Sequence, residues 1–242
     1  MTVGDLKTRI RQGEQVVGFG LPATARREQF AAALDQGPYE FVFVDSQHSP
    51  LSQPGLVSFC QLASEFSLPV RFRLEHTRLA YLSGIYLDLG ASGIEVPQVE
   101  TEATAREAVE AFYYPPVGRR SLGGGARIRV ADFDTAEAYA AWWNGYGVLW
   151  LQVESLSSVV KAPRLALPGV DCLAFGPADL ALDIANHPNP PYATVDDCVR
   201  AVARSLEGSD TVVSFRSGAP ELRQKYADLG VTVFLERPPV PV

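Results

Sequence analysis

An alternation of short apolar runs with helix-like segments is the feature that most restricts the folds open to this chain. Eight runs rich in β-branched and aromatic residues recur. Several are apolar almost throughout, as expected of parallel strands that are covered on both faces. The runs lie at residues 16–21, 40–45, 69–74, 93–98, 148–154, 172–177, 211–216 and 231–236.

Amphipathic segments lie between these runs, with apolar residues at three- and four-residue spacing, which is typical of surface helices. The clearest are residues 25–37, 102–112, 194–206 and 219–230. Alternation of strand and helix repeated eight times predicts a (β/α)₈ barrel, and a length of 242 residues suits one such domain over residues 1–242. An open doubly wound sheet is the alternative, because a count of strands does not prove closure.

Two segments depart from the regular alternation. Residues 113–147 form a long excursion before the fifth strand, and a connection of that length is usually functional or covers a site. After the eighth strand the chain reads RPPVPV, a run that cannot form a helix because proline lacks the amide hydrogen. The eighth helix of a standard barrel is therefore expected to be missing.

The net charge of the chain indicates which kinds of partner it disfavours. The chain carries 28 acidic and 21 basic residues, a net charge of −7, which argues against nucleic acid or an anionic membrane as the main partner. Three widely spaced cysteines indicate free thiols in a reducing cytoplasm rather than a disulfide framework. The N-terminal sequence has no apolar signal core, and no run is apolar enough for a membrane span.

Polar residues at the ends of the predicted strands are the candidates for chemistry, since barrel active sites lie at the C-terminal ends of the strands. A basic fork, carboxylates and a histidine are expected to converge there and suit metal-assisted chemistry on a small carboxylate. These candidates are Asp45, His48, Arg71, Arg73, Gln152, Glu154 and Asp179, and the sixth strand runs into Gly176, Pro177 and Ala178 just before Asp179.

Each of these candidates has a structural alternative. Asp45 and Asp179 are also suited to cap a turn and a short helix, His48 to a solvated loop, and one arginine of the third strand to an ion pair inside the barrel. The Asp-x-x-His spacing favours chemistry, because a carboxylate orients an imidazole. Glu154 is hardest to explain structurally, since a charge at the end of an apolar strand is costly unless paired or metal-bound.

The lysines exclude one mechanism. Schiff-base aldolases need a lysine that projects into the site. This chain has only Lys7, which precedes the first strand, and Lys161 and Lys225, which fall on predicted helices. An aldol reaction here would therefore need a metal to stabilise the enolate.

Several segments resemble the HpcH/HpaI family of class II, metal-dependent pyruvate aldolases, in the right order over roughly residues 5–235. DSQHSP at 45–50 resembles the family's DGEHxP segment, with Gln47 in place of its glutamate. VLWLQVES at 148–155 resembles its QIE motif, and GVDCLAFGPADLA at 169–181 its GVDGxFxGPADLS motif. GIEVPQ and the following residues to 123 are similar to its VPxV–helix–YPPxGxRG segment.

The resemblance implies a (β/α)₈ barrel that uses a divalent cation such as Mg²⁺, Mn²⁺ or Co²⁺ and assembles as a homo-oligomer. It implies the following roles: Glu154 and Asp179 as metal ligands; His48, held by Asp45, as the group that moves protons; Arg73, with Arg71 second, as the enolate-binding arginine; Gln152 and the backbone of Gly176, Pro177 and Ala178 as the carboxylate site.

The implied reaction is the reversible cleavage of a 4-hydroxy-2-oxo acid into pyruvate and an aldehyde. Two alternatives stay open. One is another reaction of the same enolate, either decarboxylation of oxaloacetate or condensation with an unusual acceptor. The other is a binding protein that has kept the barrel without catalysis. The sequence does not identify the aldehyde, the stereochemistry or the preferred metal.

Overall fold

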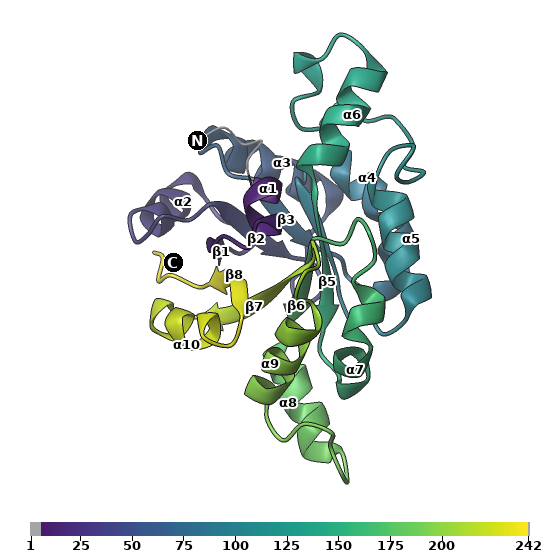
Figure 1. Cartoon of the computed structure of the whole chain (residues 1–242). Helices are drawn as coiled ribbons and strands as arrows, with labels where there is room; N and C mark the ends of the chain where they lie inside the picture. Colours follow the sequence, from purple (N-terminus) through teal and green to yellow (C-terminus); the bar gives the residue numbers. More distant parts are fainter. Residues whose placement is uncertain (1–5, 242) are drawn as a thin grey trace.

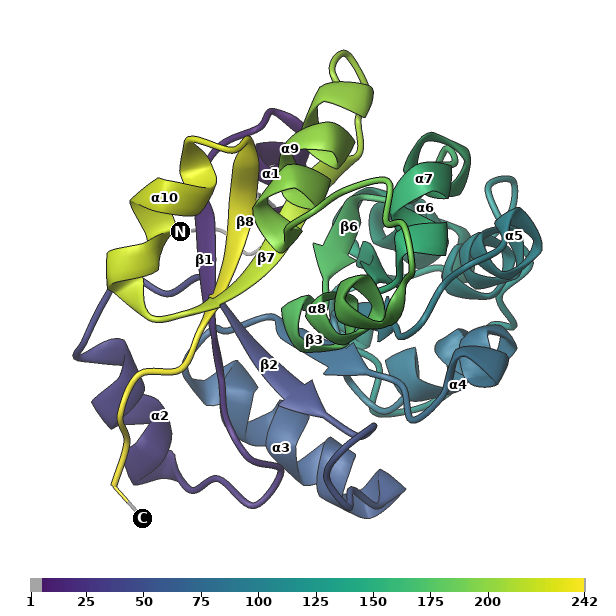
Figure 2. The same ribbon diagram turned by 90° about the horizontal axis from the view of Figure 1, so that it is seen from below.

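The protein is a closed barrel of eight parallel strands that follow one another in chain order, with β1 paired to β8 (Figures 1 and 2). The computed structural model describes residues 6–241. The predicted barrel is confirmed and the open sheet is excluded. The strands are β1 (Val16–Gly20), β2 (Phe41–Asp45), β3 (Val70–Arg73), β4 (Gly93–Val96), β5 (Val148–Val153), β6 (Cys172–Phe175), β7 (Val212–Gly218) and β8 (Val231–Glu236).

Helices surround the barrel and include all four of the segments predicted from periodicity. Thr194 caps its helix as expected, because its side chain accepts a hydrogen bond from the Asp197 amide. No helix within residues 6–241 is both long and apolar enough to cross a membrane. The helices are α1 (Leu6–Arg11), α2 (Arg27–Leu34), α3 (Gln53–Glu65), η1 (Thr77–Leu82), α4 (Ser83–Leu87), α5 (Glu102–Phe112), η2 (Val130–Asp132), α6 (Ala136–Tyr146), α7 (Leu156–Leu165), α8 (Pro177–Asn186), α9 (Val195–Ser205), η3 (Pro220–Leu222) and α10 (Arg223–Ala227).

Two large aromatic rings fill the N-terminal half of the barrel interior, each next to a glycine on a neighbouring strand. Phe41 and Trp150 fill this space, with ring centroids 5.9 Å apart. A Cβ atom added to Gly18 would lie 2.2 Å from the Phe41 ring, and one added to Gly93 would lie 2.3 Å from the Trp150 ring. The two glycines therefore provide the room that the two rings occupy.

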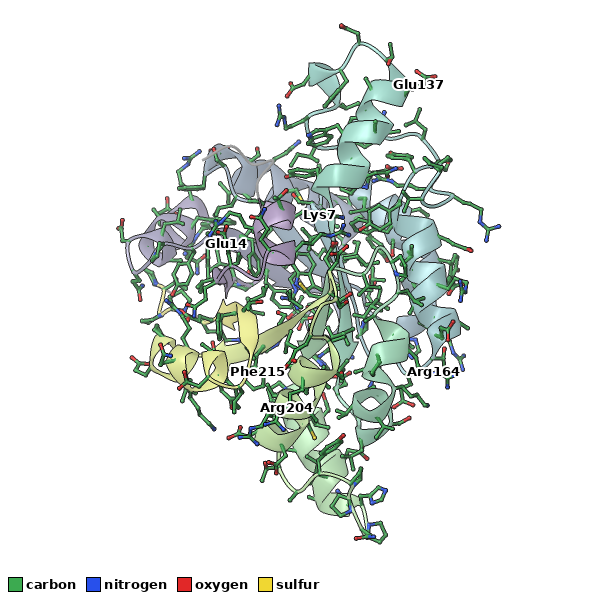
Figure 3. All side chains as sticks on the ribbon, in the orientation of Figure 1. Lys7, Glu14, Glu137, Arg164, Arg204 and Phe215 are labelled. Atoms are coloured by element: carbon green, nitrogen blue, oxygen red, sulfur yellow. The ribbon has the colours of Figure 1, made fainter. Side chains whose placement is uncertain are left out.

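The N-terminal end of the barrel is closed by α1 and a buried charge cluster. Lys7 lies on α1, and its ammonium donates to the Tyr113 hydroxyl at 2.6 Å, the Gly147 carbonyl at 2.7 Å and the Asp171 carboxylate at 3.2 Å (Figure 3). Asp171 is fully buried and also accepts a 2.7 Å hydrogen bond from Arg11. These bonds fasten α1 to the starts of β5 and β6.

The long excursion lies at this same N-terminal end. Its helix α6 ends at Tyr146, directly before β5 begins at Val148, and α6 contacts α1. Figure 1 shows α6 and α8 at opposite ends of the barrel. A connection that leads from a helix into a strand must return to the N-terminal end of that strand. Residues 113–147 are therefore not a cover over the strand ends that carry the candidate site.

The residues after β8 take the place of an eighth helix. Within the part of the chain that the structure describes, residues 237–241 form no helix and run along α2. Gln29 donates a 2.8 Å hydrogen bond to the Pro241 carbonyl, and Gln36 donates one of 2.5 Å to the Pro239 carbonyl. The expected absence of the eighth helix is confirmed over these residues.

We predict that Gly18→Ala destabilises the barrel by about 1–3 kcal/mol, because the new methyl group must displace the Phe41 ring from a close-packed interior. Urea unfolding measures the change. Gly125→Ala is the matched control, since a Cβ atom there would meet nothing within 4 Å. Equal stability of Gly18→Ala and the control would show that the interior relaxes around the ring without cost.

Candidate functional site

The C-terminal end of the barrel gathers most of the polar residues singled out from the sequence. Asp45 ends β2 and is paired in register with Arg73 at the end of β3. Gln152 lies near the end of β5, and Glu154 is the first residue after that strand. Gly176 connects β6 to α8, which carries Asp179 in its first turn. Figure 2 shows this end of the molecule, where α8 follows β6.

Arg73 is held in place by Asp45. Its guanidinium donates to both carboxylate oxygens of Asp45, at 2.8 Å from Nε and 2.5 Å from Nη2. Burial alone would raise the pKa of Asp45, but the hydrogen bonds and charge of Arg73 outweigh it and lower that pKa. The Arg73 Nη1 atom also lies 3.4 Å from Gln152 Oε1. The arginine is thereby fixed next to β5.

Glu154 is a buried carboxylate without a partner. The residue is 6% exposed, and neither carboxylate oxygen has a hydrogen-bond partner among the described residues. Burial raises the pKa of Glu154 to about 7, and the negative charges of Asp179 and Glu95 add to that effect. A Cβ atom on Gly176 would lie 2.3 Å from Glu154 Oε2, so only glycine leaves room for this carboxylate.

The same pair of carboxylates fits a divalent cation. The negative charge of Asp179 helps to raise the pKa of Glu154, and the two oxygens of Glu154 are buried without a hydrogen-bond partner among the described residues. Hard cations such as Mg²⁺ take oxygen ligands, commonly from one or two carboxylates plus water or substrate. Over residues 6–241 no cluster of three or more His, Cys, Asp or Glu side chains forms a metal site. Any cation held here would complete its coordination with substrate and water.

His48 is not joined to Asp45 in this structure. The histidine is exposed in the loop after β2. The Asp45 carboxylate instead accepts hydrogen bonds from Arg73 and from the backbone amide of Gln47, the latter at 3.0 Å. Among the described residues no hydrogen bond links Asp45 and His48. The aspartate therefore positions an arginine here, whereas the sequence led us to expect that it orients a histidine.

The start of α8 presents backbone amides beside the carboxylates. Gly176 precedes the helix and Pro177 opens it, where the missing amide hydrogen costs nothing. The amides of Ala178 and Asp179 follow in the first turn, and both residues are exposed. A helix start of this kind attracts an anion such as a carboxylate group.

Two charged residues at this end were not selected from the sequence. Glu95 lies inside β4, is 1% exposed, and accepts a 3.1 Å hydrogen bond from Arg71 Nε. Arg216 lies on β7 with its side chain 17% exposed and one nitrogen 3.7 Å from Glu95. The sequence could have identified both, because each is a charged residue within an otherwise apolar strand.

Comparisons with known proteins point to one family. The model of the HpcH/HpaI aldolase/citrate lyase family matches residues 20–229. A 2-keto-3-deoxy-L-rhamnonate aldolase of Escherichia coli K12 is 29% identical over 221 residues, which cover 90% of this chain and 81% of that protein. A crystal structure of an HpcH/HpaI aldolase from Desulfitobacterium hafniense DCB-2 has a TM-score of 0.80 at 24% identity, covering 96% of this chain and 89% of the other. A family protein from Burkholderia cenocepacia J2315 has a TM-score of 0.79 at 26% identity, with coverage of 97% and 93%.

We predict that Glu154→Gln stabilises the protein at high pH in the presence of a chelator. The pKa of Glu154 is raised, from 4.5 to about 7. The wild type therefore loses stability as the pH rises through this window, because only the unfolded chain ionises freely. The uncharged amide removes that cost, so its advantage should grow by about 2 kcal/mol between roughly pH 5 and pH 8.

Urea unfolding at the two pH values measures this difference. Glu207→Gln is the control, since Glu207 is exposed and its removal should shift both values equally. A pH-independent effect of Glu154→Gln would mean that the carboxylate is well solvated in the folded protein.

Proposed function

The chain belongs to the HpcH/HpaI aldolase/citrate lyase family of carbon–carbon lyases, and on that basis we propose that it is a metal-dependent pyruvate aldolase acting on 4-hydroxy-2-oxo acids. The observation that carries the proposal is the buried, unpartnered carboxylate of Glu154 beside Asp179. A buried charge without a partner costs stability, so its retention is best explained by a ligand that it binds.

Glu154 and Asp179 are the residues that would hold the divalent cation. When bound, a cation such as Mg²⁺, Mn²⁺ or Co²⁺ supplies Lewis-acid polarisation of the 2-oxo group. Gly176 keeps the space in front of Glu154 open, and the amides of Ala178 and Asp179 are suited to the substrate carboxylate. Gln152, which lies beside Arg73, would contact the same carboxylate.

Arg73 is the residue that would stabilise the enolate oxygen. Its guanidinium is fixed by two hydrogen bonds to Asp45, so little reorganisation is needed when negative charge develops next to it. Arg71 is a poorer candidate for this role. It is 2% exposed and is committed to Glu95 and Ser214.

His48 is the proposed proton carrier. In the cleavage direction a base removes the proton of the 4-hydroxyl group, and the electrons of the C3–C4 bond pass into the enolate as the aldehyde leaves. Protonation at C3 then yields pyruvate. His48 is exposed, so water can reach its imidazole. The 45–50 loop would have to move to bring this imidazole close to Asp45.

The positions of the lysines argue for the enolate route. Lys7 lies on α1 at the opposite end of the barrel, Lys161 on α7 and Lys225 on α10. None of the three follows the end of a strand, where a Schiff base with the substrate would have to form.

Decarboxylation of oxaloacetate is the second candidate, favoured by the separation of His48 from Asp45. Loss of carbon dioxide leaves the same pyruvate enolate without removal of a hydroxyl proton, so it needs fewer of these residues in place. Initial rates with oxaloacetate and with 4-hydroxy-2-oxo acids, measured with Mg²⁺, distinguish the two reactions. Oxaloacetate turnover far above aldol cleavage would select decarboxylation.

We predict that the wild type exchanges the methyl protons of pyruvate for deuterium only when a divalent cation is added. Glu154→Ala and Arg73→Leu should each slow this exchange by about 100-fold or more. Glu154→Ala removes a ligand of the cation and Arg73→Leu removes a positive charge, and both the cation and the arginine would stabilise the enolate. Proton NMR in deuterium oxide follows the reaction.

Glu207→Gln should exchange at the wild-type rate, since Glu207 is exposed and lies outside the site. Absence of exchange in the wild type with all three cations would overturn the aldolase proposal and favour a barrel that only binds its ligand.

A further inference from the structure

Three arginines lie in the C-terminal half of the barrel interior, and two of them have acidic partners. Arg71 donates to Glu95 Oε2 at 3.1 Å and to the Ser214 hydroxyl at 3.3 Å. Arg73 donates to both oxygens of Asp45. Both pairs are therefore neutral as units.

Arg216 is the third arginine, and among the described residues it has no hydrogen-bonded acidic partner. Its closest acid is Glu95, whose Oε1 atom lies 3.7 Å away, beyond hydrogen-bond range. The other oxygen of Glu95 is the one that serves Arg71. Within residues 6–241 no hydrogen bond leaves the Arg216 guanidinium. One glutamate thus faces two arginines, and the surplus positive charge resides on Arg216.

Arg216 packs against an aromatic ring, and Glu95 and, farther away, Asp45 are the acids near it. The guanidinium lies over the Phe43 ring, 4.6 Å from its centroid, with the side chain 17% exposed. Burial lowers the pKa of Arg216 to about 10, Glu95 opposes this, and the charges of Arg73 and Arg71 add to it. A cation in such a place gains from the arrival of an anion.

A break in strand pairing helps to place this side chain. Along β7 and β8, Phe215 pairs with Phe234, but the next pair is Gly218 with Glu236. One extra residue is therefore accommodated on β7 between Phe215 and Gly218, the interval in which Arg216 lies. Bulges of this type bend a strand and redirect a side chain, and they are common beside active sites.

The ends of β7, β8 and β1 form the part of the barrel that the proposed enolate site does not use. Gly20 ends β1, and the atoms nearest to a Cβ atom added there belong to Phe43, the Glu236 carbonyl and Arg237, none closer than 3.7 Å. Glu236, the acid at the end of β8, is fully buried and bonded to Arg223. This sector therefore has a residue without a side chain, Gly20, and positive charge from Arg216 and Arg237.

We propose that Arg216 binds a carboxylate carried by the aldehyde acceptor, so that acceptor choice depends on charge. The proposal rests on the proposed function, because an acceptor is needed only if an enolate forms. A planar guanidinium donates two parallel hydrogen bonds to a carboxylate, which favours this group over a hydroxyl. The enolate would occupy the β2, β3, β5 and β6 side, and the acceptor the β7, β8 and β1 side.

The test compares two aldehydes of equal carbon number as acceptors for pyruvate: 4-oxobutanoate, which carries a carboxylate, and butanal, which does not. Wild-type kcat/KM should favour 4-oxobutanoate. Arg216→Gln should lower kcat/KM for 4-oxobutanoate by about 10- to 100-fold, mainly through KM, and change that for butanal little. Arg216→Lys should retain an intermediate preference, because it keeps the charge but not the paired donors.

Arg204→Gln is the matched control. Arg204 is exposed on α9, and its removal should leave the preference at the wild-type value. An equal preference in the wild type and in Arg216→Gln would overturn the proposal. Loss of pyruvate methyl exchange in folded Arg216→Gln and Arg216→Lys would also overturn it, since Arg216 would then serve pyruvate.

Binding of 4-oxobutanoate, followed by saturation-transfer NMR, separates failure of this proposal from failure of the aldolase function. If the wild type exchanges no pyruvate protons but still binds 4-oxobutanoate through Arg216, the anion site stands and the aldolase function falls. Equal binding by the wild type and Arg216→Gln removes the anion site whatever the reaction is.

Discussion

The rest of the site depends on a buried carboxylate that the protein does not pair. Asp45 and Glu95 have arginine partners in the C-terminal half of the barrel, while Glu154 has no hydrogen bond among the described residues. Desolvation of such a group opposes its charged form, so the fold accepts a destabilising feature at this point. Gly176 preserves it, because any larger residue would collide with the carboxylate. The other candidate groups are arranged around this one oxygen pair.

The two ends of the barrel differ in how completely their buried charged groups are paired. At the N-terminal end, Lys7 and Asp171 form a buried cluster. Both side chains are hydrogen-bonded there, to each other and to groups from other parts of the chain. At the C-terminal end, Glu154 and Arg216 lack partners of this kind over residues 6–241. Stability is concentrated where the chain is closed by α1 and α6, and unsatisfied charge is concentrated where a ligand would enter. This division is general among barrels of this class.

Much of the fold was predictable, because the strands are short apolar runs and the helices are amphipathic. The convergence of Asp45, Arg73, Gln152 and Glu154 followed from their positions at strand ends alone. Pair identities were not predictable in the same way. Asp45 lies three positions before His48 in the chain, yet the register of β2 against β3 puts it next to Arg73. A through-space neighbour on the adjacent strand is a stronger partner than a residue in the following loop.

The charges on β4 and β7 were missed for a related reason. Glu95 and Arg216 are far apart in sequence, and only closure of the barrel brings them within 3.7 Å. The location of residues 113–147 at the N-terminal end could have been inferred, since a segment between a helix and the next strand belongs there. Its length suggested a cover for the site, but connectivity, not length, decides which end of a parallel barrel a connection occupies.

No helix follows β8 within the part of the chain that the structure describes. Residues 237–241 lie there instead, held by hydrogen bonds from Gln29 and Gln36 of the α2 region. Local opening is easiest where few contacts hold a segment. The pairing of β1 with β8 is therefore where the closed sheet should open first, so hydrogen exchange of its backbone amides is expected there before the other strand pairs.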